Sequence, residues 1–100
     1  EEMIPYFEMI SLAGDEPLFH EGDNGDALYI VMYGYLHVVK KQPDDSLQLI
    51  AEIKSGQVVG EIACLVDVAR TATIYAVRDS VLLKMTRSSF EILNKKYPEA

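Results

Sequence analysis

Short apolar runs separated by turn residues follow one another along most of the chain. In residues 27–33 both sets of alternating positions are apolar, which is typical of a strand that is buried on both faces or lies in a small barrel. Residues 47–54 instead alternate apolar and polar side chains, which predicts a half-buried strand. Comparable runs lie at residues 18–21, 35–41, 58–59, 71–77 and 80–85. The pattern therefore predicts about seven short strands.

Helical spacing is found only near the two ends of the chain. Apolar side chains at helical intervals predict a short flanking helix over residues 2–10. Thr86 is a suitable N-cap for an amphipathic helix over residues 87–96, and Pro98 ends it. Many short strands without intervening helices favour a mainly β fold, a small antiparallel β-barrel or jelly roll with flanking N- and C-terminal helices.

Composition narrows the classes of function. The chain has 100 residues, of which 49% are hydrophobic and 25% charged, so it is expected to fold as one domain around one core. Its net charge of −7 argues against a nucleic-acid surface, because phosphate repulsion would oppose binding. Cys64 is the only cysteine, which excludes an internal disulfide, favours a buried thiol and fits a reducing compartment. No apolar run approaches the length of a membrane span.

Catalytic and metal-binding signatures are not found. His20 and His37 are the two histidines, and neither lies near a serine in a nucleophile elbow or is paired recognisably with Cys64. We therefore expect no enzymatic activity. A metal-binding barrel of the cupin type is an alternative, but its first motif separates two histidines by one residue, and here they lie in different predicted strands. The acidic turn at residues 21–26 lacks the closing Glu of a calcium loop, so no metal site is expected.

One stretch in the second half of the chain concentrates the polar chemistry. Gly60 permits backbone conformations closed to other residues and lets a ligand approach closely. Glu61, Ile62 and Ala63 can open a helical turn whose free N–H groups form an anion site. Arg70 supplies a planar cation suited to phosphate oxygens, and Glu61 accepts protons from hydroxyl groups. The set suits a nucleotide-like ligand, and an ion pair between Glu61 and Arg70 is the structural alternative.

The phosphate-binding cassette of cyclic-nucleotide-binding domains resembles two segments of this chain, Gly60-Glu61-Ile62-Ala63 and Arg70-Thr71-Ala72-Thr73. Such domains occur in the regulatory subunit of cAMP-dependent protein kinase, in cyclic-nucleotide-gated channels and in catabolite-activator-like regulators. The interval from Gly to Arg matches the common length in the family, and the resemblance extends over nearly the whole chain. Val59 stands where the family usually has Phe, and Ala69 where it often has Pro.

The resemblance implies a role for each residue of the cassette. Glu61 would accept the ribose 2′-hydroxyl, and Arg70 would neutralise the cyclic phosphate. Thr71 would add a hydroxyl near the phosphate and the purine edge, which is compatible with cGMP and does not exclude cAMP. Backbone N–H groups would also bind the phosphate oxygens, from Ile62, Ala63 and Ala72.

The resemblance also implies a function for the whole domain. It is expected to be a cAMP or cGMP sensor without another cofactor, which controls an attached effector domain in the cytoplasm or at the cytoplasmic face of a membrane protein. Residues 1–100 are expected to form a single domain of a longer protein, without a full C-terminal lid helix, without direct nucleic-acid binding and with a homodimer as a compatible state. A ligand-free interaction or dimerisation module of the same fold is the alternative.

Overall fold

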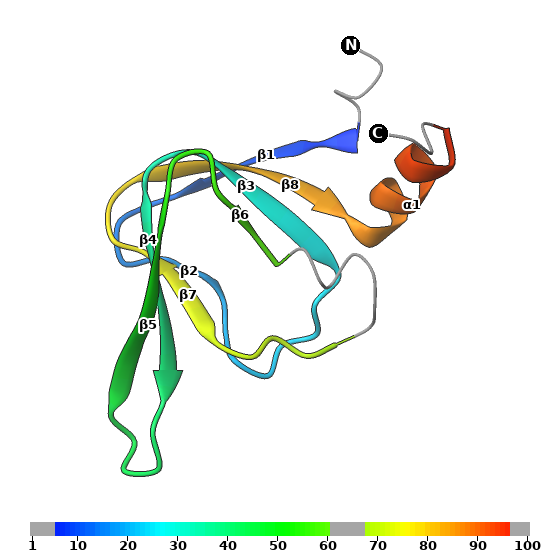
Figure 1. Ribbon diagram of the computed structural model, residues 1–100. Coiled ribbons are helices and arrows are strands. Elements are labelled where there is room, and N and C mark those ends of the chain that lie inside the picture. Colours follow the sequence, from blue (N-terminus) through cyan, green and yellow to red (C-terminus); the bar gives the residue numbers. More distant parts are fainter. Residues whose placement is uncertain (1–5, 61–67, 97–100) are drawn as a thin grey trace.

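The computed structural model describes residues 6–60 and 68–96, and within them the chain forms eight strands and one helix (Figure 1). The strands pair antiparallel in two four-stranded sheets, with the orders β1-β8-β3-β6 and β2-β7-β4-β5. The elements are β1 (Glu8–Leu12), β2 (Pro17–Phe19), β3 (Ala27–Tyr33), β4 (Tyr35–Lys41), β5 (Leu47–Lys54), β6 (Val58–Val59), β7 (Thr73–Ala76), β8 (Ser80–Thr86) and α1 (Arg87–Lys96). The predicted antiparallel β fold with a C-terminal helix is confirmed.

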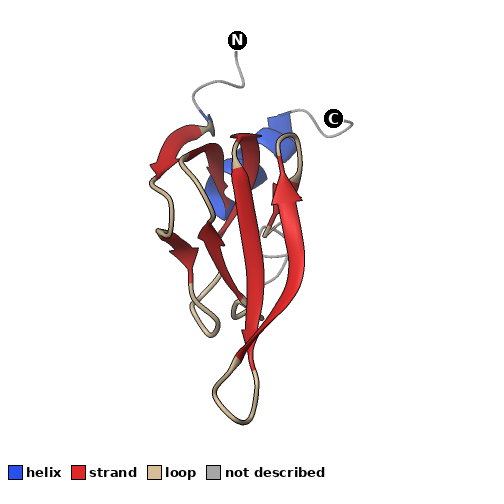
Figure 2. Ribbon diagram, turned by 90° about the vertical axis from the view of Figure 1, so that its left-hand side faces the viewer, coloured by secondary structure: helices blue, strands red, loops and turns tan. Residues whose placement is uncertain are grey.

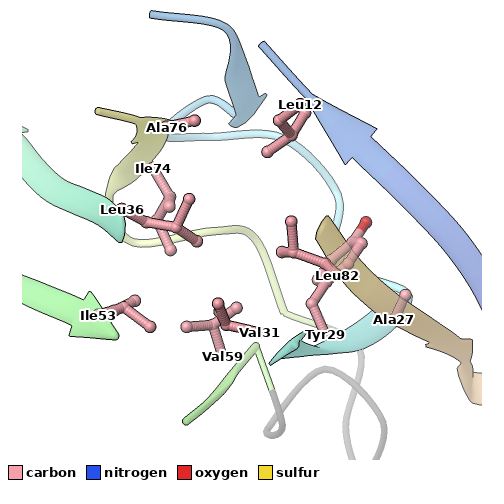
Figure 3. Close-up of a cluster of buried hydrophobic side chains, with 10 residues drawn as sticks. All are labelled: Leu12, Ala27, Tyr29, Val31, Leu36, Ile53, Val59, Ile74, Ala76 and Leu82. Carbon is pink, nitrogen blue, oxygen red and sulfur yellow. The ribbon is translucent and has the colours of Figure 1, made fainter. Parts of the chain in front are cut away.

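The core lies between the two sheets and is built from alternate residues of their strands (Figure 3). Val31 of β3 and Leu82 of β8 project from the first sheet, and Leu36 of β4 and Ile74 of β7 project from the second. Val31, Leu36 and Leu82 have no exposed surface. Burial of each such side chain contributes about 1.5–3 kcal/mol to the free energy of unfolding, which explains why the period-2 pattern specifies these strands.

The prediction of a helix over residues 2–10 is wrong in its described part, because Glu8–Leu12 forms strand β1. This strand pairs antiparallel with β8 over its whole length. Ile10 and Leu12, two positions apart, pack on the core, whereas Met9, which precedes Ile10, is 69% exposed. An isolated helix of this length is only marginally stable. Pairing with the edge of β8 instead gives the backbone of residues 8–12 hydrogen-bond partners and buries one face of the strand.

The C-terminal helix α1 begins where the sequence predicts. The N–H group of Ser89 donates a hydrogen bond to Thr86 Oγ1 at 3.1 Å, which is the contact expected of an N-cap. Phe90 and Leu93 of the helix line an apolar hollow of about 250 Å³ against the outer face of the first sheet. No helix among the described residues is long and apolar enough to cross a membrane.

The hairpin formed by β4 and β5 extends beyond the sandwich (Figure 2). β5 was predicted to be half buried, but only Ile53 of its residues is buried. The prediction fails because the tip of the hairpin has no sheet opposite it. The strand predicted over residues 71–77 is also shorter, since β7 spans only Thr73–Ala76.

Gly34, at the junction of β3 and β4, has a φ of +133°. A Cβ atom there would overlap the side chain and the Cα of Ser80, which is 2% exposed. Ser80 Oγ accepts a hydrogen bond from the Tyr35 N–H group and donates one to the Arg78 carbonyl, at 3.2 and 2.8 Å. Gly34 therefore allows the two sheets to be tied together at this turn.

Gly34→Ala is expected to lower the free energy of unfolding by about 2–4 kcal/mol, since backbone strain and overpacking both contribute. Urea unfolding with an unchanged m value measures the loss. Gly56→Ala is the matched control, because Gly56 has a φ of +89° and nothing within 4 Å of an added Cβ. The loss of stability in Gly56→Ala therefore measures the cost of backbone strain alone, about 1–2 kcal/mol. Equal losses in the two variants would contradict the packing role of Gly34.

The outer face of the second sheet carries a hydrogen-bonded row of side chains. His37 Nδ1 lies 3.2 Å from the Tyr75 hydroxyl, and its Nε2 lies 3.4 Å from the Tyr35 hydroxyl. Glu52 Oε2 lies 3.9 Å from His37 Nε2. A hydrogen bond to the Glu52 carboxylate is the main cause that raises the pKa of Tyr35 above its ordinary value of 10.0. The row connects β4, β5 and β7.

Glu52→Gln is expected to return the pKa of Tyr35 toward its ordinary value, because the carboxylate that retains the phenol proton is removed. Tyrosinate absorbance titrations of each protein, compared with its Tyr35→Phe counterpart, isolate this group. In the wild type the raised pKa favours the folded state below the unfolded-chain pKa of about 10, and this contribution is lost as the pH rises through the folded pKa. An unchanged Tyr35 titration in Glu52→Gln would refute the assignment.

Candidate functional site

Arg70 precedes β7 and is held by backbone hydrogen bonds to the turn between β2 and β3. Its N–H group donates to the Asp23 carbonyl at 2.7 Å, and its carbonyl accepts from the Gly22 N–H group at 2.8 Å. The Gly25 N–H group donates to the Val68 carbonyl at 3.0 Å. The backbone of the acidic turn at residues 21–26 therefore positions Arg70.

The Arg70 side chain points into the protein and is only 8% exposed. Its Nη2 donates a hydrogen bond to the Ala27 carbonyl at 2.8 Å. Its Cζ lies 4.1 Å from the centroid of the Phe19 ring and 6.0 Å from that of Tyr29, which allows cation–π attraction. Among residues 6–60 and 68–96, no carboxylate forms an ion pair with it. The charge is therefore held by a carbonyl dipole and aromatic rings.

The Arg70 Nε atom is buried and has no hydrogen-bond partner among the described residues. A buried donor without an acceptor costs about 1–3 kcal/mol, so such atoms are rare in folded proteins unless a ligand or water completes them. A guanidinium group presents five N–H donors in a planar fork, which matches the oxygens of a phosphate. The site therefore has unused capacity to bind an anion.

Gly60 lies at the end of β6, directly beside the guanidinium group. Its φ is +75°, and an added Cβ would lie 2.5 Å from Arg70 Nη1 and 3.0 Å from the Ala27 carbonyl oxygen. Any larger residue would displace the arginine side chain or the strand. The close approach that the sequence predicts at Gly60 is thus made in this structure by Arg70 itself.

The structure brings together two of the residues predicted for the site, Gly60 and Arg70. Thr71 follows Arg70 and is exposed, and Ala72 is half buried just before β7. The remaining predicted residues lie outside the described part of the chain, namely Glu61, Ile62 and Ala63, as does Cys64. The alternative of a Glu61–Arg70 ion pair therefore stays a prediction.

Sequence reasoning missed three contributors to the site. Phe19 of β2 and Tyr29 of β3 supply the rings near Arg70, and Ala27 supplies the carbonyl acceptor. A further contact is the hydrogen bond from the Glu21 N–H group to Thr73 Oγ1 at 2.9 Å, which ties the start of the acidic turn to β7. The only signal in the sequence was the position of Phe19 just before the glycine-rich turn, and it does not reveal the pairing with Arg70.

The turn that holds Arg70 also holds the start of the C-terminal helix. The Arg87 N–H group donates to the Asp26 carbonyl at 2.7 Å, and Arg87 Nη2 donates to the Gly25 carbonyl at 2.9 Å. One short segment thus has hydrogen bonds to the arginine at one end and to α1 at the other. Hydrogen bonds of this segment therefore connect Arg70 with the start of α1.

The two histidines lie apart from this arrangement. His20 is exposed, and His37 belongs to the row on the outer face of the second sheet. In the described ranges, no three His, Cys, Asp or Glu side chains are grouped so that they could hold a metal ion. The chemistry of the site is therefore that of a buried cation and backbone groups.

Comparison with known proteins places this arrangement in a family. A model of the cyclic nucleotide-binding domain matches residues 9–97. Lysophospholipase NTE1 of Chaetomium globosum is 34% identical over 91 residues, which make up 91% of this chain and 6% of that protein. The chain thus spans 6% of the length of the curated relatives it matches.

Solved structures agree in fold. The N-terminal domain of a transcriptional regulator from Streptomyces coelicolor A3(2) matches 98% of this chain and 68% of its own, with 30% identity and a TM-score of 0.92. cAMP-bound PfPKA-R matches 90% of this chain and 32% of its own, with 28% identity and a TM-score of 0.84. Because the family model matches most of the chain, the protein belongs to the cyclic nucleotide-binding domain family.

Proposed function

We propose that this domain binds cAMP or cGMP and is not itself an enzyme. The observation that carries the proposal is the buried Arg70 guanidinium, whose Nε has no acceptor. A cyclic phosphate supplies the acceptor oxygens and the negative charge that this group lacks among the described residues. The likeness to cAMP-bound PfPKA-R supports the choice of ligand class. The hydroxyl of Thr71 is compatible with either nucleotide.

We further propose that the domain acts as a sensor for an attached effector domain in the cytoplasm or at the cytoplasmic face of a membrane. A ligand that draws Arg70 toward its phosphate competes with the Ala27 carbonyl and the Phe19 ring. Such a shift is transmitted along the backbone of residues 22–26 to Arg87 at the start of α1. Ligand binding then favours one position of the C-terminal helix over another.

The second candidate function is a ligand-free interaction module of the same fold. It is favoured by the internal contacts of Arg70, since Nη2 already has an acceptor and the guanidinium group already lies over an aromatic ring. The two functions differ in one respect, which is whether a cyclic nucleotide stabilises the folded protein.

Saturating cAMP or cGMP is expected to raise the melting temperature of the wild type. At a ligand concentration of about 100 times Kd the added stability is about 2.7 kcal/mol, which corresponds to a rise of about 10–20 °C for a domain of this size. Arg70→Ala is expected to weaken binding roughly 10- to 150-fold, as for the loss of a charged hydrogen bond. Isothermal calorimetry on folded protein measures both affinities. If neither nucleotide binds the wild type at millimolar concentration, the proposal of nucleotide binding is refuted and the interaction module is favoured.

Gly60→Ala is expected to weaken nucleotide binding at least roughly tenfold, because the added Cβ displaces the guanidinium group that binds the phosphate. Gly56→Ala is the control, since it has a similar positive φ but no neighbour within 4 Å and lies away from Arg70. Both variants are strained, so both melt at lower temperature, but only Gly60→Ala is expected to lose affinity. Calorimetric titration of the two variants tests this, and equal affinities would show that Gly60 does not position Arg70.

A further inference from the structure

Strand β5 is an edge of the second sheet that leaves one side of its backbone unpaired. In the described part of the chain it pairs with β4 alone. Exposed apolar side chains follow one another along its first half, with Leu47 at 67%, Leu49 at 48% and Ile50 at 51% exposure. Edge strands are usually protected by charges or proline, and residues 47–51 contain neither. This edge is therefore open to pairing with another strand.

The hydrogen bonds of the hairpin show which backbone groups point outward. In antiparallel strands, hydrogen-bonded and non-hydrogen-bonded residue pairs alternate. The Gln42 N–H group donates to the Ser46 carbonyl at 2.8 Å, so the next pair, Lys41 with Leu47, is non-hydrogen-bonded. The Lys41 N–H group accordingly points away from β5, toward Glu21 Oε1 at 3.4 Å. The N–H and C=O groups of Leu47 therefore face the open edge.

The same alternation fixes the next two residues of β5. Gln48 pairs with Lys40 and directs its backbone groups toward β4. Leu49 pairs with Val39 and again directs its N–H and C=O groups toward the open edge. The outward donors and acceptors thus lie at Leu47 and Leu49, with Gln48 between them. This spacing is self-complementary, because a two-fold axis through Gln48 places position 47 opposite position 49.

We propose that β5 is a self-association edge, along which two copies of this chain pair antiparallel about a two-fold axis at Gln48. Leu47 of each copy exchanges two N–H···O=C hydrogen bonds with Leu49 of the other, and Gln48 faces Gln48 as a non-hydrogen-bonded pair. The two second sheets become one continuous sheet. The inference goes beyond nucleotide binding and uses no residue of the Arg70 site.

The side chains fit this register. Leu47 and Leu49 lie on the same face of β5, so the two-fold axis brings four leucines together at cross-strand contact distances. The hairpin carries no net charge that would oppose the approach, because three lysines balance three acids: Lys40, Lys41 and Lys54 against Asp44, Asp45 and Glu52. Lys41 Nζ already lies 3.2 Å from Asp45 Oδ1. The hairpin extends beyond the sandwich (Figure 2). Pairing of two hairpins therefore keeps the two acidic sandwiches apart.

Sedimentation velocity of the full chain over a range of concentrations tests the association. The wild type is expected to form a reversible dimer, and Leu49→Lys to raise the dimer dissociation constant at least tenfold. Met32→Lys is the matched control, because Met32 is 50% exposed but lies in β3, away from this edge. A wild type that stays monomeric at every concentration, or an equal effect of the two variants, would overturn the proposal.

Cysteine crosslinking tests the register, with Cys64 replaced by Ser in both variants. Gln48→Cys places two thiols on the two-fold axis at a non-hydrogen-bonded pair, where the Cα atoms are about 4.5 Å apart and a disulfide is allowed. Ile50 is also exposed in the strand, but a cysteine at this position does not face itself across the axis. Mild oxidation is expected to crosslink Gln48→Cys much faster than Ile50→Cys. Equal rates would overturn the proposed pairing.

Discussion

The burial of one positive charge constrains the whole site. Removing a guanidinium group from water is costly unless its surroundings compensate for the lost hydration. Here a carbonyl oxygen of Ala27 and the ring of Phe19 compensate in part, and Gly60 leaves the space that the group occupies. Within residues 6–60 and 68–96 the compensation is incomplete, because Arg70 Nε has no acceptor there. A site that is stable yet unsatisfied is suited to a ligand that carries negative charge.

The groups around Arg70 come from both sheets, which gives the site its position in the fold. Phe19 ends β2 of the second sheet, whereas Ala27 begins β3 of the first, and the turn between them binds the backbone of Arg70. The same turn binds Arg87 at the start of α1. Hydrogen bonds of this one turn thus connect the Arg70 site with both sheets and with the helix, as the proposed sensor function requires.

Local pattern predicted most strands, because alternate burial between two sheets leaves a period of two in sequences such as that of β7. It failed at β1, where Phe7 and Ile10 suggest helical spacing while Ile10 and Leu12 fit a strand equally well. Only the partner strand β8 decides between them. In the candidate site, the sequence places Gly60 and Arg70 in one short stretch, and the structure brings them together. Phe19 and Ala27 were not, because their contacts depend on how distant strands meet.

The β4–β5 hairpin shows a different limit of pattern reasoning. Alternating apolar residues predicted a half-buried strand, yet Leu47 and Leu49 lie on a face that no described layer of this domain covers. The core therefore cannot explain why these positions are apolar. The outward N–H and C=O groups of these two residues have the spacing that antiparallel pairing with a second copy of β5 requires. In the proposed dimer, the second chain buries the same two side chains. Self-association along β5 therefore accounts for the apolar character of Leu47 and Leu49, which packing in the core does not explain.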